Sequence, residues 1–266
     1  MDAYRVEPGK KIRLSDFDSA ACSLKDKADK GAKQMEKLSM ALHDLQERLY
    51  AERRHKLLVI LQGMDTAGKD GTIRHVFRYM NPQGVRVACF KQPTVPEADH
   101  DYLWRVHMQT PGAGEIVIFN RSHYEDVLIQ RVHALVPKAV WLKRYDHIND
   151  FERMLTDEGT TIIKFFLHIS YAEQKKRLLE RLGNPDKQWK LSPDDAAERR
   201  LWPAYTKAYE TVFERTSTPW APWYIIPADH KWYRNLVIST IMLAALKDLA
   251  IKRPKAQFDL SDFELD

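Results

Sequence analysis

A short apolar run that ends in a glycine-containing loop constrains this chain more than any other feature. Residues 56–62 read KLLVILQ, and residues 63–71 read GMDTAGKDG. Such a run is typical of a β-strand covered on both faces, and residues 70–80 have apolar side chains at helical spacing. Strand, glycine loop and helix together form a phosphate-binding loop, in which backbone N–H groups and a lysine surround an anion. A glycine turn with a solvated lysine is the alternative. The predicted phosphate-binding residues are Gly63, Met64, Thr66, Ala67, Gly68, Lys69 and Gly71.

Two carboxylates make this loop unusual. Asp70 stands where such loops normally carry the Ser or Thr hydroxyl that binds Mg²⁺, and Asp65 lies inside the loop. Because Mg²⁺ commonly takes one or two carboxylates together with substrate phosphates and water, these acids favour a bridging divalent ion. We expect Asp65 to be the main metal ligand and Asp70 to be a further phosphate-site or metal-site candidate. For Asp70, a carboxylate stabilised by the dipole of the following helix is the alternative.

Apolar runs alternate with helical patterns along the rest of the chain, which predicts an α/β fold. Parallel strands need crossover connections, and the helices between the runs supply them, so we expect a five-stranded parallel sheet wrapped by helices. Further strands are predicted at 85–90, 115–120, 161–169 and 223–227, and helices at about 32–54, 70–80, 96–109, 122–133, 146–157, 171–182, 194–216 and 231–250.

The third apolar run, EIVIFN, is followed by polar residues that face the expected ligand crevice. In phosphate-loop proteins such a strand usually ends in an acid that helps to hold the metal, but here it ends in the uncharged Asn120. We therefore expect Asn120 to be at most a secondary metal ligand. Arg121 can clamp phosphate oxygens in a bidentate manner, with a structural ion pair as the alternative. His123 is a candidate substrate contact, and a structural or base-stacking role is equally open.

A basic segment lies between the fourth and fifth predicted strands. Residues 175–190 read KKRLLERLGNPDKQWK, and a helical pattern resumes after the Gly-Asn-Pro break. A helix, a basic hinge and a helix in this place predict a mobile lid over phosphates, which we assign to residues 175–200. A solvated charged face is the alternative. The cations expected to contact phosphate are Arg177, Arg181, Lys187 and Lys190, together with Arg74 and Arg78 of the helix after the loop.

Composition narrows the class of protein. The 266 residues are 44% hydrophobic and carry a net charge of only +5, which suits one globular domain and gives no reason to expect nucleic-acid binding. Two distant cysteines indicate reduced thiols, and no signal peptide or membrane-spanning run is visible. We expect a cytoplasmic protein without a membrane partner, with residues 1–266 as one domain and residues 1–31 as an N-terminal arm.

Three motifs together resemble the polyphosphate kinase 2 family. They are GMDTAGKDG at 63–71, IFNRSHYEDVL at 118–128 and RLLERLGNPDKQWKLSPDD at 177–195, and the similarity runs across nearly the whole chain. The resemblance implies a P-loop kinase-like three-layer αβα sandwich with a helical lid, and phosphoryl transfer between inorganic polyphosphate and a nucleotide with Mg²⁺ or Mn²⁺. It also implies a homo-oligomer, either a dimer or a tetramer.

The resemblance also implies residue roles. The loop aspartate and lysine of the family fall on Asp65 and Lys69, the pair after the third strand on Asn120 and Arg121, and the lid arginines on Arg177 and Arg181. Much of the family has Asp in place of Asn120. The FNRSHYEDVL version is similar to the branch that accepts both AMP and ADP.

The residues fit a phosphotransferase, and other functions stay open. A terminal phosphate oxygen of a nucleotide is already ionised at pH 7, so the chemistry needs cations and alignment rather than a general base. The catalytic candidates are therefore Asp65, Lys69, Arg121, Arg177 and Arg181. An ATP-dependent nucleotide kinase is the nearest alternative, followed by a non-catalytic module that binds anions or nucleic acid, and then by an ATPase motor.

Overall fold

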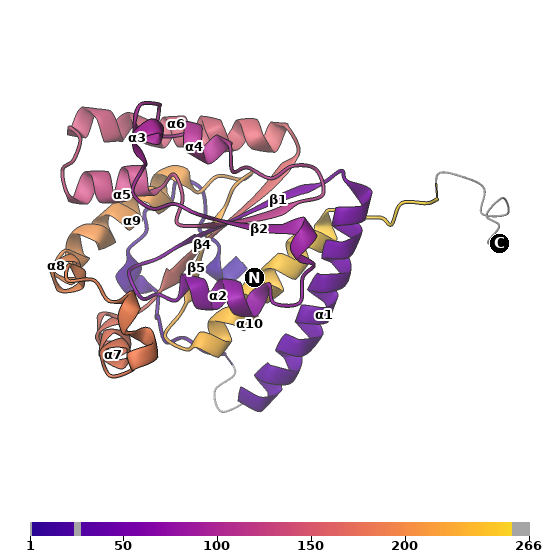
Figure 1. The fold of residues 1–266 in the computed structure, drawn as a ribbon, viewed down its shortest axis with the longest axis horizontal. Coiled ribbons are helices and arrows are strands. Elements are labelled where there is room, and N and C mark those ends of the chain that lie inside the picture. The colour runs from indigo at the N-terminus through magenta and orange to yellow at the C-terminus, as the bar shows by residue number, and fades with distance from the viewer. Residues whose placement is uncertain (1, 24–27, 257–266) are drawn as a thin grey trace.

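A five-stranded sheet forms the centre of the molecule, which the computed structural model describes over residues 2–23 and 28–256 (Figure 1). Its strands run in the spatial order β2-β3-β1-β4-β5, and every neighbouring pair is parallel. The predicted α/β fold with a five-stranded parallel sheet is confirmed. The strands are β1 (Lys56–Gln62), β2 (Val85–Cys89), β3 (Ile116–Asn120), β4 (Thr160–His168) and β5 (Trp223–Pro227).

Helices cover both faces of the sheet (Figure 1). On one face α5 (Glu125–Val132), α6 (Lys138–Asp157) and α9 (Trp202–Thr216) pack against one another. On the other face α10 (Lys231–Asp248) packs against both α1 (Ala28–Glu52) and α2 (Lys69–Val76). The remaining elements are α3 (Val95–Ala98), α4 (Trp104–His107), α7 (Tyr171–Leu182), α8 (Asp195–Arg200) and the 3₁₀ turns η1 (Asp2–Tyr4), η2 (Leu14–Asp16), η3 (Pro82–Gly84) and η4 (Pro185–Lys190).

Burial of the central strands explains their apolar sequences. Residues 57–61 of β1 are 0% exposed, because helices cover both faces of this strand. The register also fixes where the strands end: Leu61 lies opposite Asn120, and Gln62 lies opposite Phe166. The segments that follow β1, β3 and β4 therefore leave the sheet at the same edge, at the point where the strand order reverses, which is where α/β folds bind ligands.

Several helix boundaries differ from the sequence prediction. The helix predicted at 96–109 is two short helices, α3 and α4, because the Asp101 carboxylate accepts the N–H groups of Leu103 and Trp104 at 2.9 and 3.1 Å and starts a new helix. The helix predicted at 194–216 is divided into α8 and α9, with Pro203 in the first turn of α9. α6 begins at Lys138, eight residues before the predicted start at 146.

The N-terminal segment packs on the core rather than standing free. The N–H of Val6 donates to the Trp223 carbonyl at 2.9 Å, and Arg5 forms a β-bridge with Tyr224, so residues 5–6 lie beside β5. Residues 1 and 24–27 of the predicted arm lie outside the described residues. Over the ranges 2–23 and 28–256, none of the helices has the length and apolar character needed to cross a membrane.

Candidate active site

One cavity of about 1200 Å³ gathers most of the predicted site residues. The loop after β1, the ends of β2 and β3, the segment α7–η4 and the start of α10 all contribute to its walls. Side chains from distant parts of the sequence thus meet at the sheet edge where the strand ends predict a ligand site. The predicted residues that line it are Asp65, Thr66, Gly68, Lys69, Asp70, Gly71, Arg74, Arg78, Asn120, Arg121, Arg177, Arg181, Lys187 and Lys190.

The loop between β1 and α2 has a backbone that depends on its glycines. Gly68 has φ +100°, and a Cβ atom there would lie 2.2 Å from Nη1 of Arg234. Gly63 is confined in a similar way, since its Cβ would lie 2.9 Å from the Leu167 carbonyl oxygen. Thr66 adopts φ +61° although it is not a glycine. Backbone strain of this kind is characteristic of ligand-binding loops.

Gly63, Met64 and Ala67 belong to this loop but are not among the residues that line the cavity. Met64 is 7% exposed and Ala67 is 0% exposed, and the N–H of Ala67 donates to the Met64 carbonyl at 3.1 Å. Their side chains therefore support the shape of the loop. Their role as phosphate-binding residues through the backbone stays a prediction.

Lys69 begins α2 and lies at the floor of the cavity. Its Nζ donates to the Gly63 carbonyl at 3.1 Å, so the side chain folds back across the loop. Burial, and then the Arg121 guanidinium, lowers the pKa of Lys69, although nearby acids including Asp65 and Asp70 oppose the shift. A bound phosphate would stabilise the charged ammonium at this position.

Asp70 connects three elements around the cavity. Its Oδ1 accepts Nδ2 of Asn120 at 2.9 Å, and its Oδ2 lies 3.4 Å from Nζ of Lys190. Burial opposes ionisation, but the Asn120 bond and Lys190 together lower the pKa of Asp70. Asp70 also stands in the first turn of α2. Both sequence interpretations of this residue, a helix-start carboxylate and a site ligand, are therefore compatible with its position.

Asp65, Asp70 and Asn120 line one cavity, and side-chain oxygens of these residue types fit Mg²⁺. The Asp65 side chain is 41% exposed, and its nearest cation is Arg181, 3.8 Å from Oδ2. Within the described part of the chain, no three His, Cys, Asp or Glu side chains come together as a ready metal site. Two carboxylates suit a hydrated ion that substrate phosphates help to hold.

Arg121 follows β3 directly and has a left-handed backbone, with φ +63°. Its N–H donates to the Leu61 carbonyl at 3.1 Å, which continues the pairing of β3 with β1, and its side chain is exposed in the cavity wall. The position agrees with the predicted phosphate clamp.

The two arginines of α7 that were assigned to the predicted lid differ sharply in environment. Arg177 is 5% exposed, and all five N–H groups of its guanidinium find acceptors. Nε donates to the Glu173 carboxylate at 2.8 Å, and the other bonds reach the carbonyls of Thr66, Ala67, Ala228 and Asp229 at 2.7–3.1 Å. In this state Arg177 has no donor left for phosphate, and it holds the loop in place.

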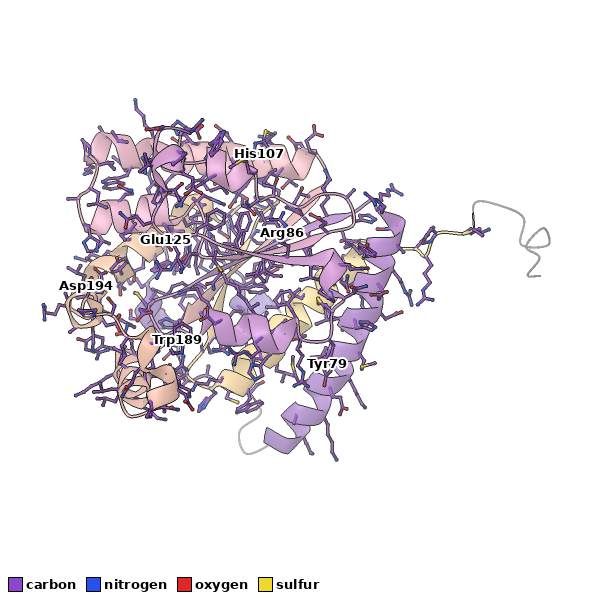
Figure 2. All side chains as sticks on the ribbon, in the orientation of Figure 1. Tyr79, Arg86, His107, Glu125, Trp189 and Asp194 are labelled. Carbon is purple, nitrogen blue, oxygen red and sulfur yellow. The ribbon has the colours of Figure 1, made fainter. Side chains whose placement is uncertain are left out.

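Arg181 is the lid arginine that is available to a ligand. Its side chain is 22% exposed, and its Nη1 makes one long bond, of 3.4 Å, to the Lys190 carbonyl. Lys187, Lys190 and the exposed Trp189, which is labelled in Figure 2, come from η4, and η4 packs against α7. Residues between 177 and 190 therefore contribute one wall of the cavity, and closure of the segment 175–200 as a lid stays a prediction.

Sequence reasoning missed Arg234. This residue of α10 is 2% exposed and donates from Nη1 to the Ala67 carbonyl at 3.2 Å, beside the Arg177 bond to the same oxygen. Burial, and then the Arg177 guanidinium, lowers the pKa of Arg234 to about 10. An arginine just before the apolar run of α10 was the available signal, but nothing local connects it with a loop 167 residues away.

The suggestion that His123 touches substrate is wrong for this structure. His123 is 0% exposed and its Nε2 lies 3.2 Å from Oε1 of Glu152, in a buried cluster away from the cavity lining. Burial lowers the pKa of His123. The physical reason is that the chain turns inward after Arg121, so that residues 122–124 face the core.

Comparison with known proteins identifies the family. The model of the family described as polyphosphate kinase 2 (PPK2) matches residues 25–254. The chain belongs to the polyphosphate kinase 2 family. The resemblance found in its motifs is confirmed, and the chain is an enzyme of a family that transfers phosphate between polyphosphate and nucleotides. Kinases of this family generally depend on a divalent metal ion.

Two relatives named for their activities match nearly the full chain. An AMP/ADP-polyphosphate phosphotransferase of Meiothermus ruber is 55% identical over 262 residues, which is 97% of each protein. An ADP-polyphosphate phosphotransferase of Rhodopseudomonas palustris is 41% identical and covers 95% of this chain and 91% of its own. The crystal structure of polyphosphate kinase 2 from Arthrobacter aurescens superposes with a TM-score of 0.94 at 44% identity, covering 98% of this chain and 93% of that one.

Proposed function

We propose that this enzyme moves the terminal phosphoryl group of inorganic polyphosphate to ADP and to AMP, in a reversible reaction assisted by Mg²⁺ (or Mn²⁺). The cationic cavity carries the proposal: among the described residues, eleven lysines and arginines line it against four aspartates and glutamates. Two polyanions must approach each other during the transfer, and such an excess of cations lowers the cost of that approach. The activities after which the two similar phosphotransferases are named support the choice of substrates.

The residues around the cavity have distinct parts in this proposal. Lys69 and the loop amides bind one phosphate chain, because the first N–H groups of a helix lack partners within it. Arg121 and Arg181 approach from the β3 end and from the lid, and stabilise the charge on the transferred group. Arg177 and Arg234 keep the loop carbonyls fixed behind it. Phosphate contacts of Arg74, Arg78, Lys187 and Lys190 extend the site along a chain of phosphates.

Asp65 is the proposed main ligand of the metal, with Asp70 and Asn120 as supporting groups. Bound Mg²⁺ would neutralise phosphate charge at the point where donor and acceptor meet. Asp65 is suited to this part because it lies inside the loop and has an exposed carboxylate. Asn120 contributes by orienting Asp70 through their 2.9 Å bond.

Activity assays on matched variants test the proposed site. Purified protein receives ADP or AMP with long-chain polyphosphate and Mg²⁺ in the absence of ATP, and a parallel reaction replaces polyphosphate with ATP. We expect Lys69→Met and Asp65→Asn to lower kcat/KM by two orders of magnitude or more, the size of one lost charge-stabilising contact. Lys176→Met is the control, because Lys176 is exposed, is not among the residues that line the cavity, and has Glu173, at 3.9 Å, as its one ion-pair partner in the described part of the chain. Variants with wild-type rates would contradict the site, and activity with ATP alone would favour an ordinary nucleotide kinase.

The proposal also includes movement of the lid and self-assembly. We treat residues 1–266 as a single kinase domain in which the segment 175–200 closes over substrate. Trypsin can cut after Lys187 and Lys190, and we expect polyphosphate to slow both cuts; unchanged cleavage with bound polyphosphate would count against closure. A dimer or tetramer, predicted from the family resemblance, is measured by light scattering.

A further inference from the structure

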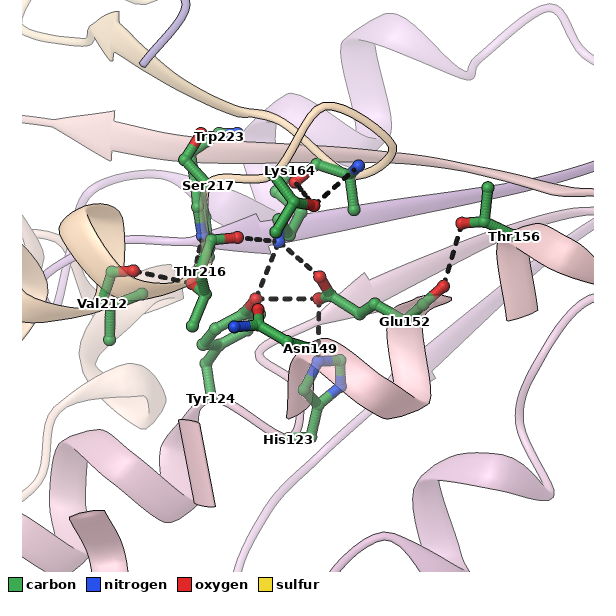
Figure 3. Close-up of polar contacts among 12 residues, drawn as sticks. His123, Tyr124, Asn149, Glu152, Thr156, Lys164, Val212, Thr216, Ser217 and Trp223 are labelled. Atoms are coloured by element: carbon green, nitrogen blue, oxygen red, sulfur yellow. Dashed lines mark hydrogen bonds and ion pairs between the residues drawn. The ribbon is translucent and has the colours of Figure 1, made fainter. Parts of the chain in front are cut away.

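A buried cluster of ionisable side chains lies under the turn that follows β3 (Figure 3). Lys164 of β4 and Glu152 of α6 are both 0% exposed and form an ion pair of 2.5 Å. Tyr124 and His123 complete the cluster from the β3–α5 turn, and both bond to Oε1 of Glu152, at 2.8 and 3.2 Å. None of these four side chains is among those that line the cavity.

The cluster satisfies nearly all of its polar groups internally. Nζ of Lys164 donates to Glu152, to the Tyr124 hydroxyl at 2.8 Å and to the Thr216 carbonyl at 2.7 Å, which uses its three N–H groups. The Tyr124 hydroxyl accepts from Lys164 and donates to Glu152, as the dashed lines in Figure 3 show. A network satisfied in this way fixes the geometry of its members, because any displacement leaves a buried polar group unpaired.

Chain connectivity links this network with the cavity. Arg121 lies in the cavity wall, and the next three residues, Ser122, His123 and Tyr124, are all 0% exposed. Ser122 is fixed as well, since its Oγ accepts Nε2 of Gln62 at 3.1 Å and the N–H of Tyr124 at 3.2 Å. The left-handed backbone of Arg121 is thus held from both sides, by the sheet bond to Leu61 before it and by the buried network after it.

We propose that Tyr124, anchored by the buried Lys164–Glu152 pair, is a positioning residue for Arg121 in phosphoryl transfer. The inference rests on the proposed function, in which Arg121 contacts the transferred phosphoryl group. A left-handed, non-glycine residue persists only where its surroundings impose it. The hydroxyl of Tyr124 connects the turn to elements β4 and α6, so its loss lets the backbone at Arg121 relax and misplaces the guanidinium.

A double-mutant cycle tests the proposal. Tyr124→Phe removes the hydroxyl and preserves the ring, and it is made in the wild type and in an Arg121→Ala background. In the wild type we expect kcat for polyphosphate-dependent ADP phosphorylation to fall about tenfold, with KM for ADP changed less than twofold. In the Arg121→Ala background we expect almost no further decrease, because no guanidinium remains to be positioned.

Controls separate positioning from a general loss of folded protein. Tyr145→Phe removes the hydroxyl of another tyrosine that is 0% exposed, on α6, whose bond goes to Arg131 rather than to the turn. We expect it to leave kcat unchanged, and denaturant unfolding confirms that every variant is folded at the assay temperature. An equal fold-decrease from Tyr124→Phe in both backgrounds, or no decrease in the wild type, overturns the inference.

Failure of the proposed function gives a different result. If wild-type protein transfers no phosphate from polyphosphate, or if Arg121→Ala alone keeps wild-type kcat, then the assignment of Arg121 fails, and the positioning role falls with it. If Arg121→Ala is impaired and the two substitutions act independently, only the positioning role is refuted.

Discussion

Exchanging each lid arginine for lysine should separate a residue that holds the loop from one that serves the substrate. Arg177 makes five hydrogen bonds from a buried guanidinium, whereas Arg181 makes one long bond from a partly exposed side chain. Lysine has three N–H groups, so Arg177→Lys loses at least two of these five charge-assisted bonds, and among the described residues only the Ala67 carbonyl keeps a second partner, Arg234. Each lost bond costs about 1–3 kcal/mol, which predicts a loss of about 2–6 kcal/mol in the free energy of unfolding.

The same substitution at Arg181 should leave stability almost unchanged and lower the rate of phosphoryl transfer. Arg181→Lys puts at risk only the 3.4 Å bond to the Lys190 carbonyl and the partly exposed 3.8 Å ion pair with Asp65, so we expect the free energy of unfolding to change by less than ~1 kcal/mol. Lysine cannot reproduce bidentate phosphate binding, and kcat should therefore fall about tenfold. The two variants keep the same charge, so each serves as the control for the other.

Urea unfolding followed by tryptophan fluorescence measures the stability of both variants, and the polyphosphate assay measures their rates. A loss of 2–6 kcal/mol is a large share of the ~5–15 kcal/mol typical of folded proteins, so the unfolding midpoint of Arg177→Lys should fall clearly below that of the wild type. If Arg177→Lys keeps wild-type stability and loses most of its transfer activity, Arg177 is a substrate clamp and the structural argument is refuted.

Three further predictions follow from individual contacts. Gly68→Ala should lower stability and polyphosphate affinity more than Gly159→Ala does. Both glycines have positive φ, but of the two only Gly68 would place its Cβ against a neighbouring atom, Nη1 of Arg234 at 2.2 Å. Equal losses in unfolding and binding assays would contradict this. Burial raises the pKa of Asp126 to about 6, against the opposing Arg144 guanidinium. Since the unfolded value is 3.8, the folded protein binds this proton more tightly, and the contribution of Asp126 to stability falls as pH rises from about 4 to above 6. In the wild type this decrease in the free energy of unfolding should amount to about 2–3 kcal/mol over that pH range, and Asp126→Asn should remove it. Urea unfolding at several pH values measures the effect, and parallel pH profiles for the two proteins would refute the raised pKa. EDTA should abolish transfer and excess Mg²⁺ should restore it, whereas full activity in EDTA would contradict the metal site.

Local sequence patterns predicted the fold because each strand of the sheet is marked by a short apolar run in the sequence. The apolar runs coincide with the five strands, and those of β1, β3 and β4 are almost entirely buried, whereas the edge strand β2 is partly exposed. The loop, Asn120 and Arg121 were placed together because parallel strands end at one edge of the sheet, and the register of Leu61 with Asn120 confirms this placement. Helix ends were less predictable, since a single side chain such as Asp101 can start a new helix.

The environment of each charged residue could not be read from the sequence. Arg177 and Arg181 lie four residues apart on one helix and looked equivalent, yet one is saturated with buried acceptors and the other is available. The difference depends on carbonyls of Ala67 and Ala228, which only the tertiary fold brings to α7. Arg234 was missed, and the choice between the two roles of His123 stayed open, because burial and long-range partners determine what each residue does.

Transfer from polyphosphate to AMP, followed by ³¹P NMR, tests the central claim most directly. The reaction contains purified protein, AMP, long-chain polyphosphate and Mg²⁺, and no ATP. The account predicts that the β-phosphate signal of ADP and then the γ-phosphate signal of ATP appear while polyphosphate is consumed, and that Lys69→Met abolishes both signals. Nucleotide signals that stay unchanged, or polyphosphate that is released only as inorganic phosphate, would contradict it.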